Sequence, residues 1–317
     1  MRRLLVIFLT AVILTGASPV SVNHAKEGLI RYGAGDYVGA MESFRMARSA
    51  DMGKAAYMAW GMATLRLEKY RSAAAKFGMA SGKDPSDGDP LALMGESYLR
   101  DGSPREAIAV FARIGNRPLT DPVGVKILWG VASNGAGAHA HALSLFREAG
   151  RTAMPQRRGE IVRGEGAALI GLGRHDEADE RLGRYLRENP DDAGALALAG
   201  EASLKRGSFD TASRRLRTAL DKGAPVGPTA YNLACAESRR GAFDDACAAL
   251  RRSCAAGFDC ATPMRADPDL LPLRDRGCLD RPSPPGGERP KKGGPSHSGG
   301  GSEPSADRPA HSQPLSR

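Results

Sequence analysis

Aromatic residues are scarce in this 317-residue chain, because Phe, Trp and Tyr together make up only 5% of it. That share is low for a globular domain and favours a core packed with alanine and leucine. Cysteine is absent before Cys235, so disulfides do not form a framework for the whole chain. A long apolar run is also missing, since the run from Leu4 to about Leu14 is shorter than the roughly 20 residues of a membrane span.

Sequence motifs for catalysis are absent as well. The chain contains no HExxH, no GxSxG, no CxxC and no glycine-rich phosphate loop ahead of a helix. His139 and His141 form the one close histidine pair, but residues two apart on a helix point in different directions and do not readily share a metal. The acidic residues show no spacing typical of a catalytic pair. We therefore expect no enzymatic activity, no metal site and no cofactor.

What the sequence does contain is a pattern that returns about every 34 residues. It is clearest in Lys54–Asp87, where Gly61 lies in one helical run while Ala73 and Phe77 follow in a second, which Pro85 ends. The steps between successive large apolar residues of the pattern are 33, 34, 35, 36, 34 and 34 residues. This period is typical of stacked helix hairpins.

Six further copies carry the same skeleton of a small residue, an alanine and a large apolar residue. A small residue opposite an alanine lets two helix backbones approach closely, and the Phe or Leu fills the space toward the next pair. The copies are Gly28, Ala40 and Phe44; Gly95, Ala107 and Phe111; Gly130, Ala142 and Phe146; Gly166, Ala178 and Leu182; Gly200, Ala212 and Leu216; Ala234, Ala246 and Leu250.

Glycine and proline mark the predicted helix ends. A left-handed terminal residue favours glycine, and proline lacks the amide hydrogen that continues a helix. The glycines near the ends of first helices are Gly102, Gly137, Gly173, Gly207 and Gly241. The prolines between one pair and the next are Pro85, Pro118, Pro155, Pro190 and Pro225.

The pattern resembles the tetratricopeptide repeat, most clearly at Trp60-Gly61, Tyr70, Ala73, Phe77, Ala80 and Pro85, and again at Gly200, Gly207, Phe209, Ala212 and Ala219. The resemblance covers roughly Ser21 to Cys260. It implies an all-α fold, a right-handed superhelical solenoid of about seven helix hairpins. The pattern is most degenerate at residues 21–53 and 123–158, where His139 replaces the usual Tyr or Phe.

Composition divides the chain into four parts. Residues 1–22 read as a signal peptide or N-terminal anchor, residues 23–262 as the solenoid, 263–280 as a closing segment and 281–317 as a tail. Met264–Gly277 resembles the closing segment of bacterial members of the family. The tail is rich in Pro, Gly and Ser and almost devoid of apolar side chains, so we expect it to be disordered.

The N-terminal part has the layout of a secretory signal, with two arginines, a short apolar run and small residues at Thr15-Gly16-Ala17. We expect export to the periplasm or beyond, with cleavage after or near Ala17. An uncleaved segment that holds the chain at the inner membrane is the alternative. Lipidation at this place is excluded, because Ala17 stands where a cysteine is required.

All five cysteines fall between Cys235 and Cys278, in the last repeat and the closing segment. In an exported chain this favours disulfides that secure the C-terminal end of the solenoid, where no further repeat covers the core. Cys254 and Cys260 flank a turn and are the candidate pair, while the odd count leaves at least one thiol free or intermolecular. The alternative is reduced, buried cysteines; a zinc site is disfavoured by their irregular spacing.

The resemblance also implies that the first helices line a concave face. Positions three before, one after and four after each small residue then point into it, and the candidate partner-binding residues among them are Met58, Met62, Glu96, Arg163, Glu201 and Tyr231. This groove is largely apolar with isolated charges, which suits a peptide. The two methionines could equally be core between repeats. The basic clamp that some members use for peptide C-termini is not evident, since only Arg163 could serve.

The predicted function is therefore a non-enzymatic scaffold for a protein or peptide partner, and the oligomeric state stays open. One alternative is a membrane-anchored accessory of a pilus or secretion assembly. Another is a binder of an anionic polymer, using the arginines Arg151, Arg157, Arg158 and Arg163. The net charge of +9 gives no basic stripe for nucleic acid, because arginines and acidic residues alternate along the helices.

Overall fold

The computed structural model describes residues 23–260, 267–274 and 276–278, and all of them belong to the first of two compact units, Met1–Arg281 and Pro282–Arg317. In these residues the chain forms α-helices and two short 3-10 helices, without a strand. The predicted signal and the predicted disordered tail lie outside them. No helix in the described part of the chain is long and apolar enough to cross a membrane.

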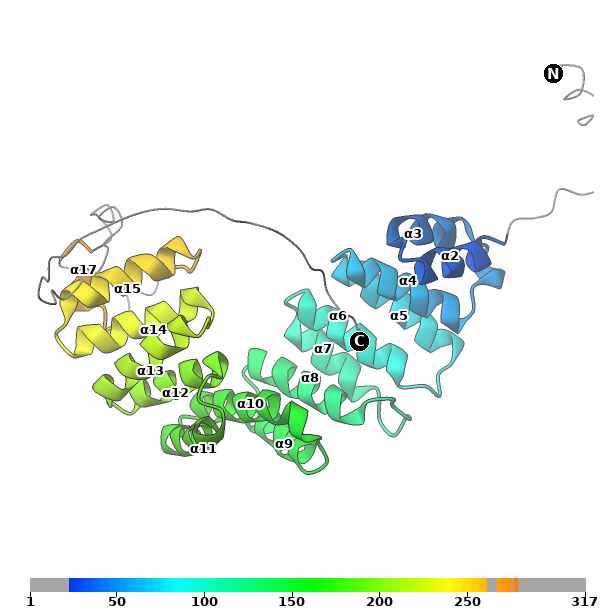
Figure 1. Cartoon of the computed structure of the whole chain (residues 1–317). Coiled ribbons are helices and arrows are strands. Elements are labelled where there is room, and N and C mark those ends of the chain that lie inside the picture. The colour runs from blue at the N-terminus through cyan, green and yellow to red at the C-terminus, as the bar shows by residue number, and fades with distance from the viewer. Residues whose placement is uncertain (1–22, 261–266, 275, 279–317) are drawn as a thin grey trace, which may run out of the picture. The chain divides into compact units, whose positions relative to one another are not determined.

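Seven helix pairs follow one another in these residues (Figure 1), as the all-α solenoid prediction requires. The pairs are α2 (His24–Gly33) with α3 (Tyr37–Met46), α4 (Lys54–Arg66) with α5 (Tyr70–Lys83), α6 (Asp89–Arg100) with α7 (Pro104–Ala112), α8 (Pro122–Gly135) with α9 (His139–Gly150), α10 (Arg158–Gly171) with α11 (His175–Glu188), α12 (Ala193–Lys205) with α13 (Phe209–Asp221), and α14 (Val226–Arg239) with α15 (Phe243–Ala255). The short helices η1 (Ser49–Asp51), η2 (Pro155–Arg157) and α17 (Leu271–Arg274) complete the described elements.

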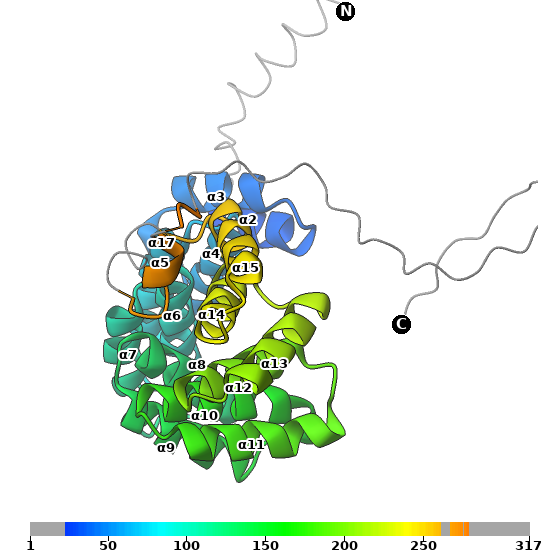
Figure 2. The ribbon, with the colours of Figure 1, turned by 90° about the vertical axis from the view of Figure 1, so that its left-hand side faces the viewer.

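Most first helices contact the first helix of a neighbouring pair. Besides its own second helix, α2 contacts α4. In the same way α6 contacts α8, α8 contacts α10, α10 contacts α12 and α12 contacts α14. The direction of the helix axes changes along this stack, as the turned view from α11 to α15 shows (Figure 2). The first helices thus form one layer of neighbouring surfaces, and residues from different repeats meet there.

Each pair is held by a small residue of the first helix against a large one 16 positions later. A Cβ atom placed on Gly61 would lie 2.5 Å from the Phe77 ring, and one on Gly200 would lie 2.6 Å from Leu216. The four phenylalanines of this set are at most 1% exposed, and the three leucines are fully buried. The predicted contact of small with large is confirmed, and it leaves no space for a side chain at these glycines.

The first helices end in a repeated turn. In the α4–α5 turn, the Lys69 N–H donates to the Thr64 carbonyl and the Glu68 N–H to the Leu65 carbonyl, the two bonds of a Schellman motif. The residue after the cap has a positive φ in all seven pairs, between 73° and 81° at six glycines and 57° at Glu68. The predicted glycine ends are confirmed, and Glu68 is the one non-glycine residue of the described chain in that conformation.

The two repeats with a degenerate pattern nevertheless form complete pairs, α2–α3 and α8–α9. Their connections to the next pair contain the 3-10 helices η1 and η2. His139 begins α9, and its ring lies so close to Gly171 of α10 that a Cβ there would be 2.5 Å away. The imidazole therefore fills a space between neighbouring repeats although it is polar, and the pair forms without the usual Tyr or Phe.

Replacing Gly95 with Ala should lower the unfolding free energy by about 1–3 kcal/mol, since the new methyl group overlaps the buried Phe111 ring. Gly78→Ala is the matched control, because a Cβ at Gly78 meets only Met94 at an ordinary 3.7 Å. Helix propensity alone should then stabilise the control by up to about 1 kcal/mol. Urea unfolding of both variants checks this, and equal shifts of the same sign would contradict it.

Glu68→Gly should stabilise the chain. It removes a left-handed strain of about 1–2 kcal/mol, partly offset by the roughly 0.5–1 kcal/mol lost to a more flexible unfolded chain. The control is Glu106→Gly in α7, where φ is helical and a loss of about 1 kcal/mol is expected. Thermal melting distinguishes them, and destabilisation by Glu68→Gly would show that its side chain contributes more than its backbone costs.

Candidate partner-binding surface

A cavity of about 520 Å³ opens on the layer of first helices. It draws residues from four successive repeats, on α4, α6, α8 and α10 and on the connections that precede α8 and α10. Its lining residues are Met58, Asp89, Ala92, Leu93, Glu96, Thr120, Asp121, Gly124, Val125, Ile127, Leu128, Arg157 and Glu160. Because no single repeat supplies more than a part of it, the cavity exists only through stacking.

The floor of the cavity is apolar. It consists of Met58 from α4, Leu93 from α6 and three residues of α8, Val125, Ile127 and Leu128. Met58, Leu93 and Leu128 are half-buried and pack against the neighbouring core clusters, whereas Val125 and Ile127 are buried. An apolar surface that is only partly covered can bury the side chain of a ligand.

Half of the remaining lining residues are acidic. Asp89 accepts hydrogen bonds from the Thr120 N–H, at 2.9 Å, and from its hydroxyl. Asp121 caps the N-terminus of α8 by accepting from the Gly124 N–H at 2.8 Å, and it also pairs with Arg157. The bonds to Thr120 and Arg157 connect the start of one repeat to the connection that precedes the next first helix, and they fix the carboxylates at the cavity.

Glu96 and Glu160 supply two more carboxylates. Glu96 is half-buried, and its Oε1 atom accepts from Arg100 at 2.7 Å one helical turn further along α6. Glu160 is exposed in the first turn of α10, where a negative charge is favoured by the helix dipole. The cavity is therefore lined by four carboxylates and one guanidinium, that of Arg157.

Of the six residues expected on the concave face, the cavity contains Met58 and Glu96. Met62 is half-buried and packs against the cluster of Leu65, Ala73 and Phe77 instead. Replacing Met62 with Glu would therefore place a charge against this cluster and disturb its packing. The core interpretation of Met62 thus has support in its contacts.

Arg163 is engaged within the protein. Its Nη1 atom lies 2.5 Å from Asp192 Oδ2, the carboxylate that caps α12 and that also accepts from the Tyr185 hydroxyl at 3.0 Å. Burial opposes the charge of Asp192, but the Ala195 N–H, Tyr185 and Arg163 together lower the pKa of this carboxyl. Arg163 therefore joins α10 to α12 and is not free to clamp a peptide C-terminus.

Glu201 and Tyr231 lie further along the same layer, outside the cavity. Burial raises the pKa of Glu201, against the favourable charges of Lys205 and His175. Tyr231 is half-buried, and its hydroxyl donates to Asp267 Oδ2 of the closing segment at 2.7 Å. Burial and this bond raise the pKa of Tyr231. The closing segment thus covers the face of α14 that was expected to meet a partner.

The cavity extends about one helical turn beyond the expected stripe, toward the N-termini of the first helices. Asp89 and Glu160 lie six residues before Gly95 and Gly166, a position that the expected stripe did not include. Extending the stripe by a turn toward the N-terminus would have found both. Thr120, Asp121 and Arg157 belong to connections and could not have been placed by helix periodicity.

The arginine cluster named as a possible anion site is largely neutralised. Arg157 pairs with Asp121, Arg158 with Glu188 at 2.6 Å, and Arg163 with Asp192. In each case the two partners lie about 30 residues or more apart in the chain. These arginines connect segments of the solenoid, and the surface around them is not a free basic patch.

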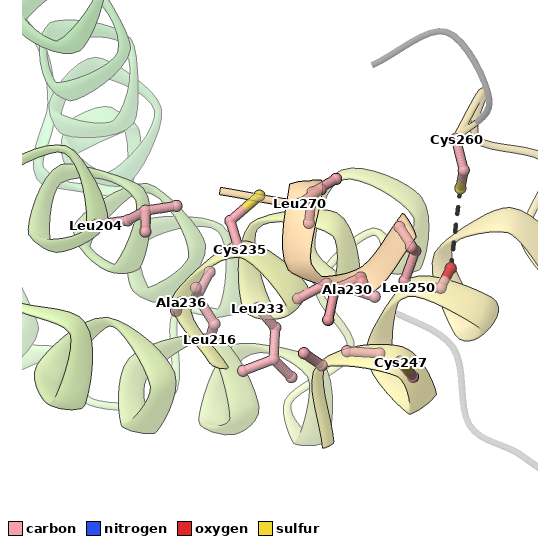
Figure 3. Packing of buried hydrophobic residues seen from close by; sticks show 14 of the residues in the cluster. Leu204, Leu216, Ala230, Leu233, Cys235, Ala236, Cys247, Leu250, Cys260 and Leu270 are labelled. Carbon is pink, nitrogen blue, oxygen red and sulfur yellow. Dashed lines mark hydrogen bonds between the residues drawn. The ribbon is translucent and has the colours of Figure 1, made fainter. Parts of the chain in front are cut away.

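The closing segment completes the core at the C-terminal end. Leu270 and Leu273 are fully buried, in one cluster with Cys235 and Leu250 (Figure 3). The closing segment thus covers the apolar side of the last helix pair, α14 and α15, on which the first helix of another repeat would pack if the solenoid continued. Arg239 of α14 adds an ion pair of 2.9 Å to Asp269, so both apolar and charged contacts hold the segment.

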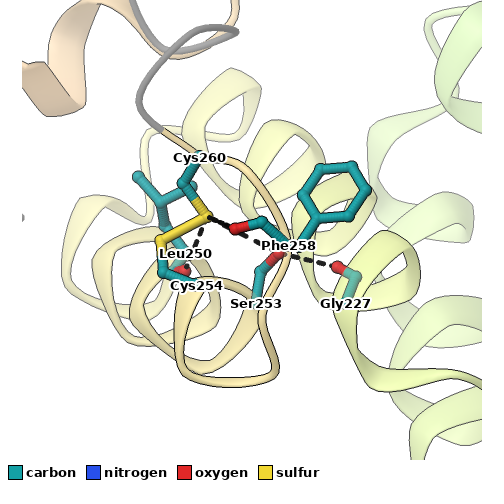
Figure 4. Close-up of a disulfide and its surroundings, with 6 residues drawn as sticks. All are labelled: Gly227, Leu250, Ser253, Cys254, Phe258 and Cys260. Carbon is teal, nitrogen blue, oxygen red and sulfur yellow. Dashed lines mark hydrogen bonds between the residues drawn. A yellow bond between two sulfur atoms is a disulfide. The ribbon is translucent and has the colours of Figure 1, made fainter.

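Two disulfides secure this end of the chain. Cys254 and Cys260, the pair expected from the sequence, are joined with their Cα atoms 5.6 Å apart (Figure 4). Cys247 is joined to Cys278 with a Cα separation of 5.3 Å. The second bond connects α15 to the closing segment. Cys235 is free and buried, and burial together with the Asp267 and Asp269 carboxylates raises the pKa of its thiol.

Cys235, Asp267 and Asp269 also form a group whose ligand atoms lie within 4.8 Å of one another, as a metal site would require. The Asp267 carboxylate already accepts from Tyr231, and that of Asp269 pairs with Arg239. Burial and the two carboxylates raise the pKa of the Cys235 thiol, which disfavours the thiolate that a metal requires. The group is therefore satisfied by internal hydrogen bonds and ion pairs.

Protein purified under oxidising conditions should contain one thiol, that of Cys235, and should label with maleimide only after unfolding, because this thiol is buried. Peptide mass mapping should recover the pairs Cys247–Cys278 and Cys254–Cys260. Cys247→Ser with Cys278→Ser opens a loop that spans 31 residues and should cost about 2–4 kcal/mol of stability. Five free thiols would contradict the assignment.

Comparison with known proteins supports the fold. Two tetratricopeptide repeat family models match residues 58–119 and 169–236. A tetratricopeptide repeat protein from Parabacteroides merdae is 14% identical with a TM-score of 0.61, over 79% of this chain and 96% of that one. The Cut9–Hcn1 structure of the APC/C is 16% identical with a TM-score of 0.57, over 84% of this chain and 51% of that one. The pilF structure from Pseudomonas aeruginosa is 15% identical with a TM-score of 0.51, over 71% of this chain and 97% of that one. No curated protein matches the chain.

Proposed function

This chain is a tetratricopeptide repeat protein, and we propose that it is a non-enzymatic scaffold that holds a peptide segment of a partner protein against its first helices. The observation that carries the proposal is the cavity on α4, α6, α8 and α10, with its apolar floor. A volume of about 520 Å³ falls within the range of ligand sites and accommodates large side chains of an extended or helical peptide.

The proposed location is the cell envelope. Support comes from the signal-like layout of residues 1–22 and from the two disulfides at the C-terminal end, since disulfides persist mainly in oxidising compartments. N-terminal sequencing of the mature protein should begin near Ser18. Recovery of a chain that starts at Met1 in the membrane fraction would favour an uncleaved N-terminal anchor.

A pilus or secretion accessory and a binder of an anionic polymer have less support. The accessory role rests on no specific contact or site, because a structural likeness at low identity shows the fold alone. Binding of an anionic polymer would require unpaired basic groups, and three of the four arginines considered for it are paired with carboxylates.

Filling the cavity tests the proposal. Ala92→Trp places a large ring at a half-buried position of the lining and should reduce partner recovery at least tenfold in a pull-down from the exported fraction. Ala75→Trp is the control, because Ala75 is an exposed residue of the second helix α5 and does not line the cavity. Both variants should melt near the wild-type temperature. Equal recovery with both would place the partner elsewhere on the chain.

A further inference from the structure

We propose that the cavity selects a cationic, apolar peptide segment: a large aliphatic or aromatic side chain flanked by Lys or Arg. This inference rests on the proposed function and names the chemistry of the partner at the same site. It follows from the pairing of an apolar floor with carboxylates from three successive repeats, Asp89 and Glu96 on α6, Asp121 before α8 and Glu160 on α10.

The sign of the charge is opposite to that of the chain. The whole sequence carries a net charge of +9, yet four of the five charged groups that line the cavity are acidic. Lys and Arg outnumber Asp and Glu in the whole sequence by only 45 to 36, so a random sample of charged groups would be close to balanced and slightly basic. The carboxylates at the cavity depart from that balance toward negative charge, which favours cationic ligands over anionic ones.

The one basic group at the cavity does not reverse this preference. Arg157 forms an ion pair with Asp121, so the positive charge of this guanidinium is balanced by one of the four carboxylates. Asp89 accepts hydrogen bonds from Thr120, a neutral residue, so its carboxylate is not used up by an ion pair with a basic side chain. Glu96 forms an ion pair with Arg100 through Oε1, at 2.7 Å, and its second oxygen takes part in no hydrogen bond among the described residues.

Glu160 is the most available of these carboxylates. It is exposed, and it forms no ion pair with any residue that the structure describes. A lysine or arginine next to an apolar anchor could therefore reach it without displacing an internal partner. The attraction is strengthened when the apolar anchor excludes water from the floor, because the local dielectric constant falls.

Short fluorescein-labelled peptides test the chemistry directly. The probe Gly-Ser-Lys-Leu-Leu-Lys-Ser-Gly supplies both features, while replacement of its lysines by Glu removes the charge match and replacement of its leucines by Ser removes the anchor. With the mature full-length chain, fluorescence anisotropy should show the first peptide binding at least tenfold tighter than either of the others. The affinity of this peptide should fall as the salt concentration is raised, because salt screens the attraction between its lysines and the carboxylates at the cavity.

Charge reversal supplies the matched variants. Glu160→Lys should weaken the Lys-Leu-Leu-Lys peptide about tenfold, which corresponds to about 1.4 kcal/mol, and should strengthen the Glu-substituted peptide. Glu106→Lys is the control, because Glu106 is also exposed and in the first turn of a helix, α7, but lies outside the cavity. The control should bind all three peptides as the wild type does.

The outcomes separate the two proposals. Tighter binding of the Glu-substituted peptide, or equal weakening by Glu160→Lys and Glu106→Lys, would overturn the cationic assignment. If no peptide binds but Ala92→Trp still abolishes recovery of the cellular partner, the cavity is the partner site and the inferred chemistry is wrong. If Ala92→Trp has no effect either, the proposed function fails as well.

Discussion

The close contact between a glycine of a first helix and a Phe or Leu of the second is the interaction on which the structure depends. Because Gly95 has no side chain, α6 approaches α7 until the Phe111 ring fills the space between them. A similar contact recurs in pair after pair, so that the first helices also meet one another in one layer. The cavity on α4, α6, α8 and α10 is a product of that spacing, since each repeat contributes only a few of its walls.

Charged contacts then fix how neighbouring repeats are aligned. Lys54 reaches Asp84 at 2.8 Å, Arg71 reaches Asp101 at 2.7 Å and Arg239 reaches Asp269 at 2.9 Å, each across about one repeat of sequence. Such surface pairs contribute little stability individually. Their regular spacing instead favours one alignment of each repeat against the next. Arg158 and Arg163 of α10 take part in the same kind of contact, with Glu188 and Asp192, and are therefore paired although the chain has a high net positive charge.

The sequence was sufficient for the helix pairs because their determinants are local. Gly61 and Phe77 lie 16 residues apart, and the terminal glycines such as Gly102 act within one turn. The cavity was predicted only at Met58 and Glu96, because its other walls depend on how repeats stack and on the connections between them. Tyr231 was expected to face a partner. The closing segment covers it through a contact across 36 residues that no helical periodicity could reveal.

A crystal structure of the chain with the Lys-Leu-Leu-Lys peptide tests most directly whether stacking of the first helices creates a selective partner site. We expect a leucine of the peptide against Leu93 and Leu128, and a lysine within 4 Å of Glu160 or Glu96, the distance that defines an ion pair. A peptide bound to the second helices, or along α14 in place of the closing segment, would contradict the assignment of the partner site to this cavity.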